Sequence, residues 1–176
     1  MPDNPPLHWT AAAERFSCFR WSSARPRPVN GIPLAVTPTP MALHPTIDRW
    51  RSAGRELGMI TFLESQTLAD RAVGARVRAG FTGIGLCESD VLCLDDTSGD
   101  LFVLDHEIED RVLCDVAKDQ ESFLRAAELL EEHFAQCAAR AEYRADKRAA
   151  ASVALACARA AGGNLYASFY HMMVGA

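Results

Sequence analysis

The residues best suited to chemistry lie in one acidic stretch, VLCLDDTSGDLFVLDHE, which spans residues 91–107. It ends in Asp105-His106-Glu107, and carboxylates beside an imidazole suit either metal binding or acid–base catalysis. Neighbouring side chains on a strand point to opposite faces, so Asp105 and His106 converge only if the strand ends before them. The stretch contains no second histidine, and we expect neither a metal site nor a catalytic site here.

We expect the carboxylates of this region to form a surface for a protein partner instead. Residues 86–132 carry fifteen acidic and three basic side chains, while the whole chain has a net charge of −5. Such a block repels nucleic acid and attracts basic partners, and a solvated face is the alternative. Binding residues concentrate on turns and strand ends. The candidates there are Asp95, Asp96, Asp100, Glu107, Glu109 and Asp110.

The cysteines do not have the spacing of a metal site. Zinc sites use pairs of ligands separated by two to four residues, and Cys87, Cys93 and Cys114 lie on separate predicted strands. We expect reduced thiols that bind no metal. The sequence also lacks G-x-S-x-G, a phosphate loop and H-E-x-x-H, and its glycine-rich GFTGIG precedes a strand rather than a helix. We therefore expect no catalytic residue and no cofactor, and we do not expect an enzyme.

Basic and aromatic residues near the start of the chain suit single-stranded nucleic acid, namely Trp9, Trp21, Arg25 and Arg27. The acidic remainder of the chain opposes such binding, because like charges repel the phosphate backbone. We expect no nucleic-acid partner.

The elements that position the acidic stretch are predicted to be strands. The runs VLCL and LFVL are short, rich in branched residues and bounded by turn formers, and Gly99 in the linker between them accepts a positive φ. Both runs are apolar at every position, so both faces of the sheet need cover. We predict consecutive antiparallel strands at 81–87, 91–95, 100–105 and 111–116, and another strand at 59–64. Gly83 and Gly85 indicate a bulge or a close approach of another element.

Helices are predicted on either side of these strands. One begins near Thr46 or Asp48 and ends by Gly58. Another has Asp119 as its N-cap, and its buried face comprises Phe123, Leu124, Ala127, Leu130, Phe134 and Cys137. An alanine-rich helix over 144–161 is predicted to end at Gly162. We expect the apolar tail after it to dock on the core or on a second copy of the chain. A homodimer is therefore one possible state of the protein. The fold class is α+β, with a mostly antiparallel sheet of about four to six strands and helices packed beside it.

The length of 176 residues predicts a single domain over 1–176. Within it we expect an irregular, proline-rich segment over about 1–46 and a helical extension over about 141–176. There is no run of 18 apolar residues and no secretory signal. We expect a cytoplasmic protein with no membrane partner.

The segment over residues 80–134 resembles the SUKH superfamily of bacterial immunity proteins, which includes the Smi–Knr-type regulators, and it is most similar to the fourth immunity subgroup. The resemblance lies in the strand FTGIGL, then VLCLDDTSGDLFVLDHE, then VLCDVAKDQESFLRAAELL. The family's motifs correspond here to Leu94-Asp95, Ser98-Gly99, Val103-Leu104-Asp105, and Ala117 through Phe123-Leu124.

The resemblance implies a single SUKH-like domain that binds and neutralises a cognate polymorphic toxin by covering its active site. Such toxins frequently act on nucleic acid, and a basic active-site surface would complement the acidic block. Two alternatives stay open. One is a regulatory or scaffold protein of the Smi–Knr type, and the other is an enzyme that uses the acidic cluster.

Overall fold

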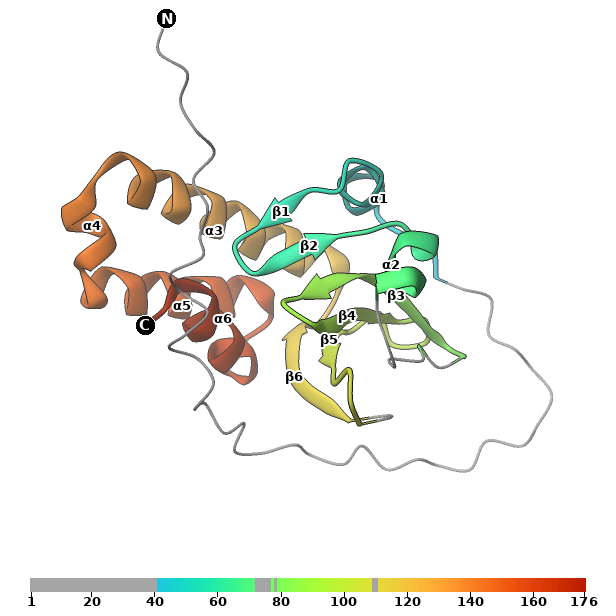
Figure 1. Ribbon diagram of the computed structural model, residues 1–176. Coiled ribbons are helices and arrows are strands. Elements are labelled where there is room, and N and C mark those ends of the chain that lie inside the picture. Colours follow the sequence, from blue (N-terminus) through green and yellow to red (C-terminus); the bar gives the residue numbers. More distant parts are fainter. Residues whose placement is uncertain (1–40, 72–76, 78, 109–110) are drawn as a thin grey trace, which may run out of the picture.

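An antiparallel meander forms the centre of the protein (Figure 1). The computed structural model describes residues 41–71, 77, 79–108 and 111–176, so the basic and aromatic residues near the start lie outside the described part. Each strand pairs with the next one along the chain, and the order is β1 Glu56–Leu57, β2 Ile60–Phe62, β3 Phe81–Cys87, β4 Asp90–Asp95, β5 Leu101–Leu104 and β6 Val112–Ala117. The last four match the strands predicted from the sequence, and the α+β class with a six-stranded sheet is confirmed.

Helices pack beside the sheet, and most of them follow the last strand. In Figure 1, α3 to α6 occupy the orange-to-red end of the chain, and α5 packs against both α3 and α6. The helices are α1 Pro45–Ser52, α2 Ser65–Arg71, α3 Gln120–Ala139, α4 Ala141–Ala145, α5 Lys147–Ala161 and α6 Ala167–Val174, with a 3₁₀ turn η2 over Asn164–Tyr166.

Both faces of the sheet are covered, as the all-apolar strands predict. Leu92 and Leu94 of β4 belong to a large cluster with buried residues of α1, α3, α5 and α6. The alternate residues, Val91 and Cys93, belong to a smaller cluster with Leu68 of α2. The two-residue period of a strand therefore divides β4 between two cores.

The glycines of β3 allow both a bulge and a close approach. The pairing register of β3 and β4 shifts between Gly83 and Gly85. A Cβ atom at Gly83 would lie 2.5 Å from Cδ2 of Leu68, so α2 packs directly over this position. Gly99 has a φ of +81° in the β4–β5 turn, as expected.

The first helix is shorter than predicted, and a strand follows it. α1 begins at Pro45, where the side chain of His44 accepts a hydrogen bond from the amide of Thr46. Gly54 then takes a φ of +60°, which ends the helical path. Glu56–Leu57, predicted to be helical, instead forms β1 and pairs with β2, because two residues are too short to show an alternating pattern.

The single alanine-rich helix predicted over 144–161 is in fact two helices. Asp146 interrupts it with extended backbone, and its side chain accepts hydrogen bonds from the amides of Arg148 and Ala149. An aspartate at this position caps the following helix more favourably than it continues the preceding one. The predicted end of the helix at Gly162 is correct.

The other helical predictions are confirmed in their main features. The Asp119 side chain accepts a hydrogen bond from the Ser122 amide at 2.6 Å and caps α3. The predicted buried face of α3 is mostly buried, although Leu124 and Phe134 are half-buried. Of the apolar tail, Phe169 and Tyr170 of α6 dock on the core of the same chain, while Leu165 stays 59% exposed.

Candidate functional site

The β4–β5 hairpin has its turn at one end and two free strand ends at the other. The side chains able to do chemistry lie at the free strand ends. Asp90 is the first residue of β4, and Asp105 and His106 follow directly after β5. Antiparallel pairing of Val91 with Leu104 brings these two strand ends together. Among the described residues, Asp90, Asp105 and His106 form the one group of three or more side chains that could ligate a metal, and their ligand atoms lie within 4.8 Å of one another. β5 ends before Asp105, so the alternation of a strand does not place Asp105 and His106 on opposite faces, and their side chains can converge.

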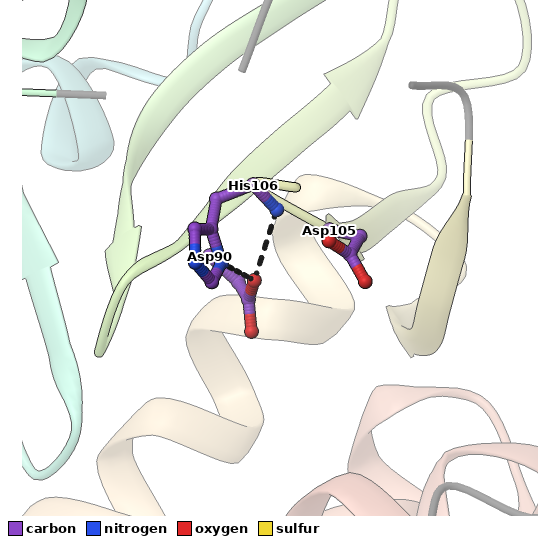
Figure 2. Close-up of side chains that lie close together, drawn as sticks. All are labelled: Asp90, Asp105 and His106. Carbon is purple, nitrogen blue, oxygen red and sulfur yellow. Dashed lines mark hydrogen bonds and ion pairs between the residues drawn. The ribbon is translucent and has the colours of Figure 1, made fainter. Parts of the chain in front are cut away.

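Asp90 fixes the position of the His106 ring (Figure 2). One of its carboxylate oxygens, Oδ1, lies 2.7 Å from Nδ1 of His106 and also accepts a hydrogen bond from the His106 amide at 3.1 Å. A carboxylate only accepts, so we assign a proton to Nδ1, and in the neutral ring Nε2 then keeps a lone pair. Nε2 lies 3.7 Å from the exposed carboxylate of Glu107. In isolation, such an imidazole can act as a base or as a metal ligand.

Asp105 closes the loop between β5 and β6. It is only 7% exposed. Its Oδ1 atom accepts hydrogen bonds from the amides of Glu107 and Ile108, and its Oδ2 atom pairs with the guanidinium of Arg111. The Asp105 amide also donates to the Arg111 carbonyl at 2.9 Å. Both oxygens are thus engaged with the protein, and a metal ion here would have to displace a guanidinium cation.

The contacts of Asp105 with the Glu107 and Ile108 amides and with Arg111 form a clamp, here called the Asp105 clamp. Figure 2 marks interactions between His106 and Asp90, while Asp105 belongs to a separate set of contacts with its own loop. Hydrogen bonds from the protein occupy the carboxylate that a metal or substrate would need. The arrangement connects the start of β4 with residues 105–108 after β5.

The predicted partner-binding residues divide between the two ends of the hairpin. Asp95, Asp96 and Asp100 lie together at the β4–β5 turn, and each is half-buried. Glu107 lies beyond the other end of β5, roughly 15 Å away at the usual rise of a strand. Glu109 and Asp110 lie outside the described residues. The described candidates thus form two groups, one at each end of the hairpin.

Two carboxylates at the turn have structural contacts. Oδ1 of Asp95 accepts hydrogen bonds from the amides of Thr97 and Ser98. Oδ1 of Asp96 accepts from the Thr82 hydroxyl at 2.8 Å and from the Met41 amide at 3.3 Å. These bonds stabilise the turn and attach it to β3 and to the segment before α1. Charge reversal at either residue would disturb the turn as well as any surface.

The opposite loop exposes an apolar residue that the sequence reasoning missed. Ile108 is 48% exposed, and the adjacent Glu107 side chain is 76% exposed. The available signal was a single isoleucine within an acidic run, DHEIED, where no strand or helix pattern requires an apolar residue.

The five described cysteines are free and buried. Burial raises the pKa of the Cys87, Cys93 and Cys157 thiols to about 12 and raises the pKa of Cys114 well above its usual range. Thiols of this kind stay protonated near neutral pH and behave as small apolar side chains. Burial also raises the pKa of Cys137, which in addition contacts an imidazole, Nε2 of His133, a residue that the sequence reasoning did not consider.

No known protein family, characterised protein or solved structure matches this chain. None of the helices in the described residues is both long and apolar enough to span a membrane.

Proposed function

We propose that this protein is a non-catalytic binding protein that neutralises a cognate toxin in the cytoplasm, as an immunity protein of the SUKH type does. The proposal draws on the resemblance of residues 80–134 to that superfamily and on the acidic block within them. The six-stranded antiparallel sheet with helices beside it is the architecture that the resemblance leads one to expect.

The observation that carries the proposal is the hydrogen-bonded start of the β5–β6 loop, residues 105–108. Buried Asp105 binds the amides of Glu107 and Ile108, and so it holds an exposed carboxylate beside an exposed isoleucine. Preorganisation lowers the entropic cost of binding, because hydrogen bonds hold residues 105–108 in place before the partner arrives. An apolar contact surrounded by charged groups is the usual composition of a protein interface.

The acidic composition favours a basic partner. A toxin that acts on nucleic acid needs a positively charged cleft for phosphate groups, and an acidic loop is complementary to such a cleft. Covering that cleft would exclude the substrate. The alternative of an enzyme is less favoured, since both oxygens of Asp105 are occupied by groups of the protein itself.

The proposal predicts a toxin gene directly before the gene of this protein, and the test is neutralisation of the toxin that it encodes. Cells that express the toxin domain should grow when the full chain is co-expressed and fail to grow without it. The double variant Glu107→Lys with Ile108→Asp should lose protection, since it reverses the charge and removes the apolar contact. Glu128→Lys, on the exposed face of α3, is the matched control and should protect fully.

Two results would reject the proposal. One is the absence of protection by the unaltered, folded protein against the neighbouring toxin, which would favour the regulatory scaffold. The other is full protection by the folded double variant, which would remove the β5–β6 loop from the interface.

A further inference from the structure

A histidine lies buried near the end of α3, beneath the short helix α4. His133 is 4% exposed, and its Nε2 atom lies 3.5 Å from Sγ of Cys137, one turn further along α3. Its Nδ1 atom is buried and has no hydrogen-bond partner in the part of the chain that the structure describes. Buried polar groups are normally hydrogen-bonded, so this nitrogen calls for an explanation. The contact with Cys137 does not supply one, because it engages the other ring nitrogen.

Few contacts hold α4 over His133. Figure 1 shows α4 between α3 and α5, at the end of the helical layer that points away from the sheet. The centroid of the Tyr143 ring lies 5.5 Å from that of the His133 ring. Arg144 donates hydrogen bonds to the carbonyl oxygen of Cys137 at 3.3 and 3.0 Å. The helix has five residues, and none of them is buried. A segment with so few buried contacts can open while the rest of the fold stays intact.

The charged form of His133 does not fit its place in the structure. A protonated imidazole donates from both nitrogens, so Nδ1 would carry a hydrogen without an acceptor, and Nε2 would face only a sulfur atom, which accepts weakly. Burial of a charge without a partner is far costlier than burial of a neutral polar group. Water would solvate both nitrogens once α4 had moved away. Protonation of the ring and opening of α4 therefore favour each other.

The charged groups around His133 do not offset a positive charge on the ring. Arg144 contacts Cys137, and the guanidinium of Arg140 lies 5.3 Å from the Tyr143 ring centroid, and both side chains are cations. The face of the Tyr143 ring attracts cations, but burial has the larger effect and lowers the pKa of His133. None of the described carboxylates forms an ion pair with His133. The other charged residues of α4, of its junction with α5, and of α5 and β1, which also pack against α3, are exposed: Glu142, Asp146, Lys147, Arg148, Arg159 and Glu56.

We propose that α4 is an acid-operated lid, which protonation of His133 releases from the end of α3. The ring takes up one proton at its free lone pair, and the contacts of Tyr143 and Arg144 with α3 are then broken. Arg140 and Asp146, at the two ends of α4, have extended backbone and serve as the hinges. Opening exposes the face of α3 that carries His133 and Cys137. The inference does not rest on the proposed function.

The direction of the pH dependence follows from the two environments of the ring. In the closed form, burial holds the pKa of His133 below its ordinary value of 6.5. In the open form the ring is in water, where histidine titrates near pH 6.5 or so, about its ordinary value. The lid is thus most stable above about pH 6.5, and this stability is lost as the pH falls toward the pKa of the closed form. Because one proton is bound on opening, the equilibrium constant for opening rises by up to about tenfold for each pH unit in that interval.

Hydrogen exchange of single amides, measured by NMR on the full-length protein, tests the proposal. The amides of Arg144 and Asp146 donate to Arg140 and Tyr143 at 3.3 and 3.2 Å and report on α4, while the amides of β4 report on the sheet. Each exchange rate is divided by the intrinsic rate at the same pH. Protection of the α4 amides should be lower than that of the β4 amides, and it should fall by up to about tenfold per pH unit below about pH 6.5. This measurement needs no substitution, so it does not depend on the folding of a variant.

Two variants assign the effect to one histidine. His133→Phe keeps an aromatic ring against Tyr143 and cannot be protonated, so protection of the α4 amides should no longer vary with pH. His171→Gln is the matched control, because His171 is half-buried on α6 in the same helical layer, and it should keep the pH dependence.

Three results would overturn the proposal. The first is protection of the α4 amides that does not change with pH in the unaltered protein. The second is a pH dependence that persists in His133→Phe or disappears in His171→Gln. The third is equal protection of the α4 and β4 amides, which would mean that only global unfolding exposes His133. None of these results depends on toxin binding.

Discussion

The hydroxyl of Tyr170 donates a hydrogen bond to the carbonyl oxygen of Val116, 3.1 Å away. Val116 lies on β6, at the edge of the sheet, and Tyr170 lies on α6 near the end of the chain. Burial raises the pKa of Tyr170 well above its usual range, so the hydroxyl keeps its proton. The last helix thus satisfies a backbone group at the sheet edge, and such cover opposes edge-to-edge association.

Removal of this hydroxyl should destabilise the fold. Tyr170→Phe leaves the Val116 carbonyl buried without its donor, at a cost of about 1–3 kcal/mol in the free energy of unfolding. Urea denaturation followed by circular dichroism measures the change. Tyr143→Phe is the control, because Tyr143 is half-buried on α4 and keeps its ring contact with His133. Equal midpoints for Tyr170→Phe and the unaltered protein would contradict the role assigned to this bond.

The strands could be predicted from the sequence because their signal is local. Residues 91–94 are all apolar, and each is buried between two layers, so pattern and environment agree. β1 could not be predicted, since its pairing with β2 depends on a turn at Gly58, where the ring of Phe134 leaves no room for a side chain. That contact joins residues far apart in the chain.

The candidate site was only partly predictable for a similar reason. The sequence identifies the carboxylates but not their contacts. Whether Asp105 faces solvent or binds two amides and Arg111 depends on the loop that closes around it. The position of Asp95 and Glu107 at opposite ends of the hairpin, in contrast, already follows from the predicted strands at 91–95 and 100–105.

The Asp105 clamp should contribute strongly to stability. Asp105→Ala removes the acceptor for two amides and the partner of Arg111, and we expect a loss of about 2–3 kcal/mol because hydrogen bonds to a charged group are the stronger kind. Chemical denaturation tests this, with Glu128→Ala on the exposed face of α3 as the control. A loss no greater than that of the control would mean that the loop holds its conformation without the carboxylate.

Asp119 should make the protein sensitive to acid. Burial alone would raise the pKa of Asp119, but the hydrogen bonds from Ser122 and the nearby Lys118 outweigh it, and the pKa lies below its usual value. The carboxylate therefore stabilises the fold fully above the unfolded pKa of about 3.9, and this contribution is lost as the pH falls through the folded pKa. Asp119→Asn keeps a capping side chain without the charge. As the pH falls below about 3.9, the unaltered protein should lose more stability than the variant; parallel pH profiles would contradict this.

His133 should add a second acid-sensitive step at higher pH. Burial lowers the pKa of His133 below its model-compound value of 6.5. The folded state therefore favours the neutral ring, and stability should fall as the pH drops below the unfolded pKa of about 6.5, until the folded pKa is reached. His133→Phe removes the titrating group, so the free energy of unfolding should change less with pH in that interval. Urea midpoints across the interval measure it, and an unchanged slope in the variant would assign the sensitivity to other groups.

Charge reversal at Glu107 should alter the kinetics of partner binding. Glu107 is exposed, so salt screens its attraction to a basic toxin. Such an attraction mainly raises the rate of association, because it acts while the two proteins approach each other. Glu107→Lys should lower the association rate by about tenfold or more at low ionic strength and weaken the dependence of that rate on salt. Stopped-flow fluorescence with an inactivated toxin domain measures both quantities.

The control for that measurement needs a carboxylate with no ion pair of its own to break. Glu131 is unsuitable, because it accepts from Arg55 at 2.7 Å and its reversal would break that ion pair. Glu128 is exposed on the same helix and carries the same charge. If Glu107→Lys and Glu128→Lys slow association equally, the toxin responds to net charge alone. If only Glu107→Lys slows association, the Glu107 charge itself steers the encounter with the toxin. If Ile108→Ala separately speeds dissociation, the apolar contact of Ile108 stabilises the bound complex, as apolar contacts at interfaces usually do.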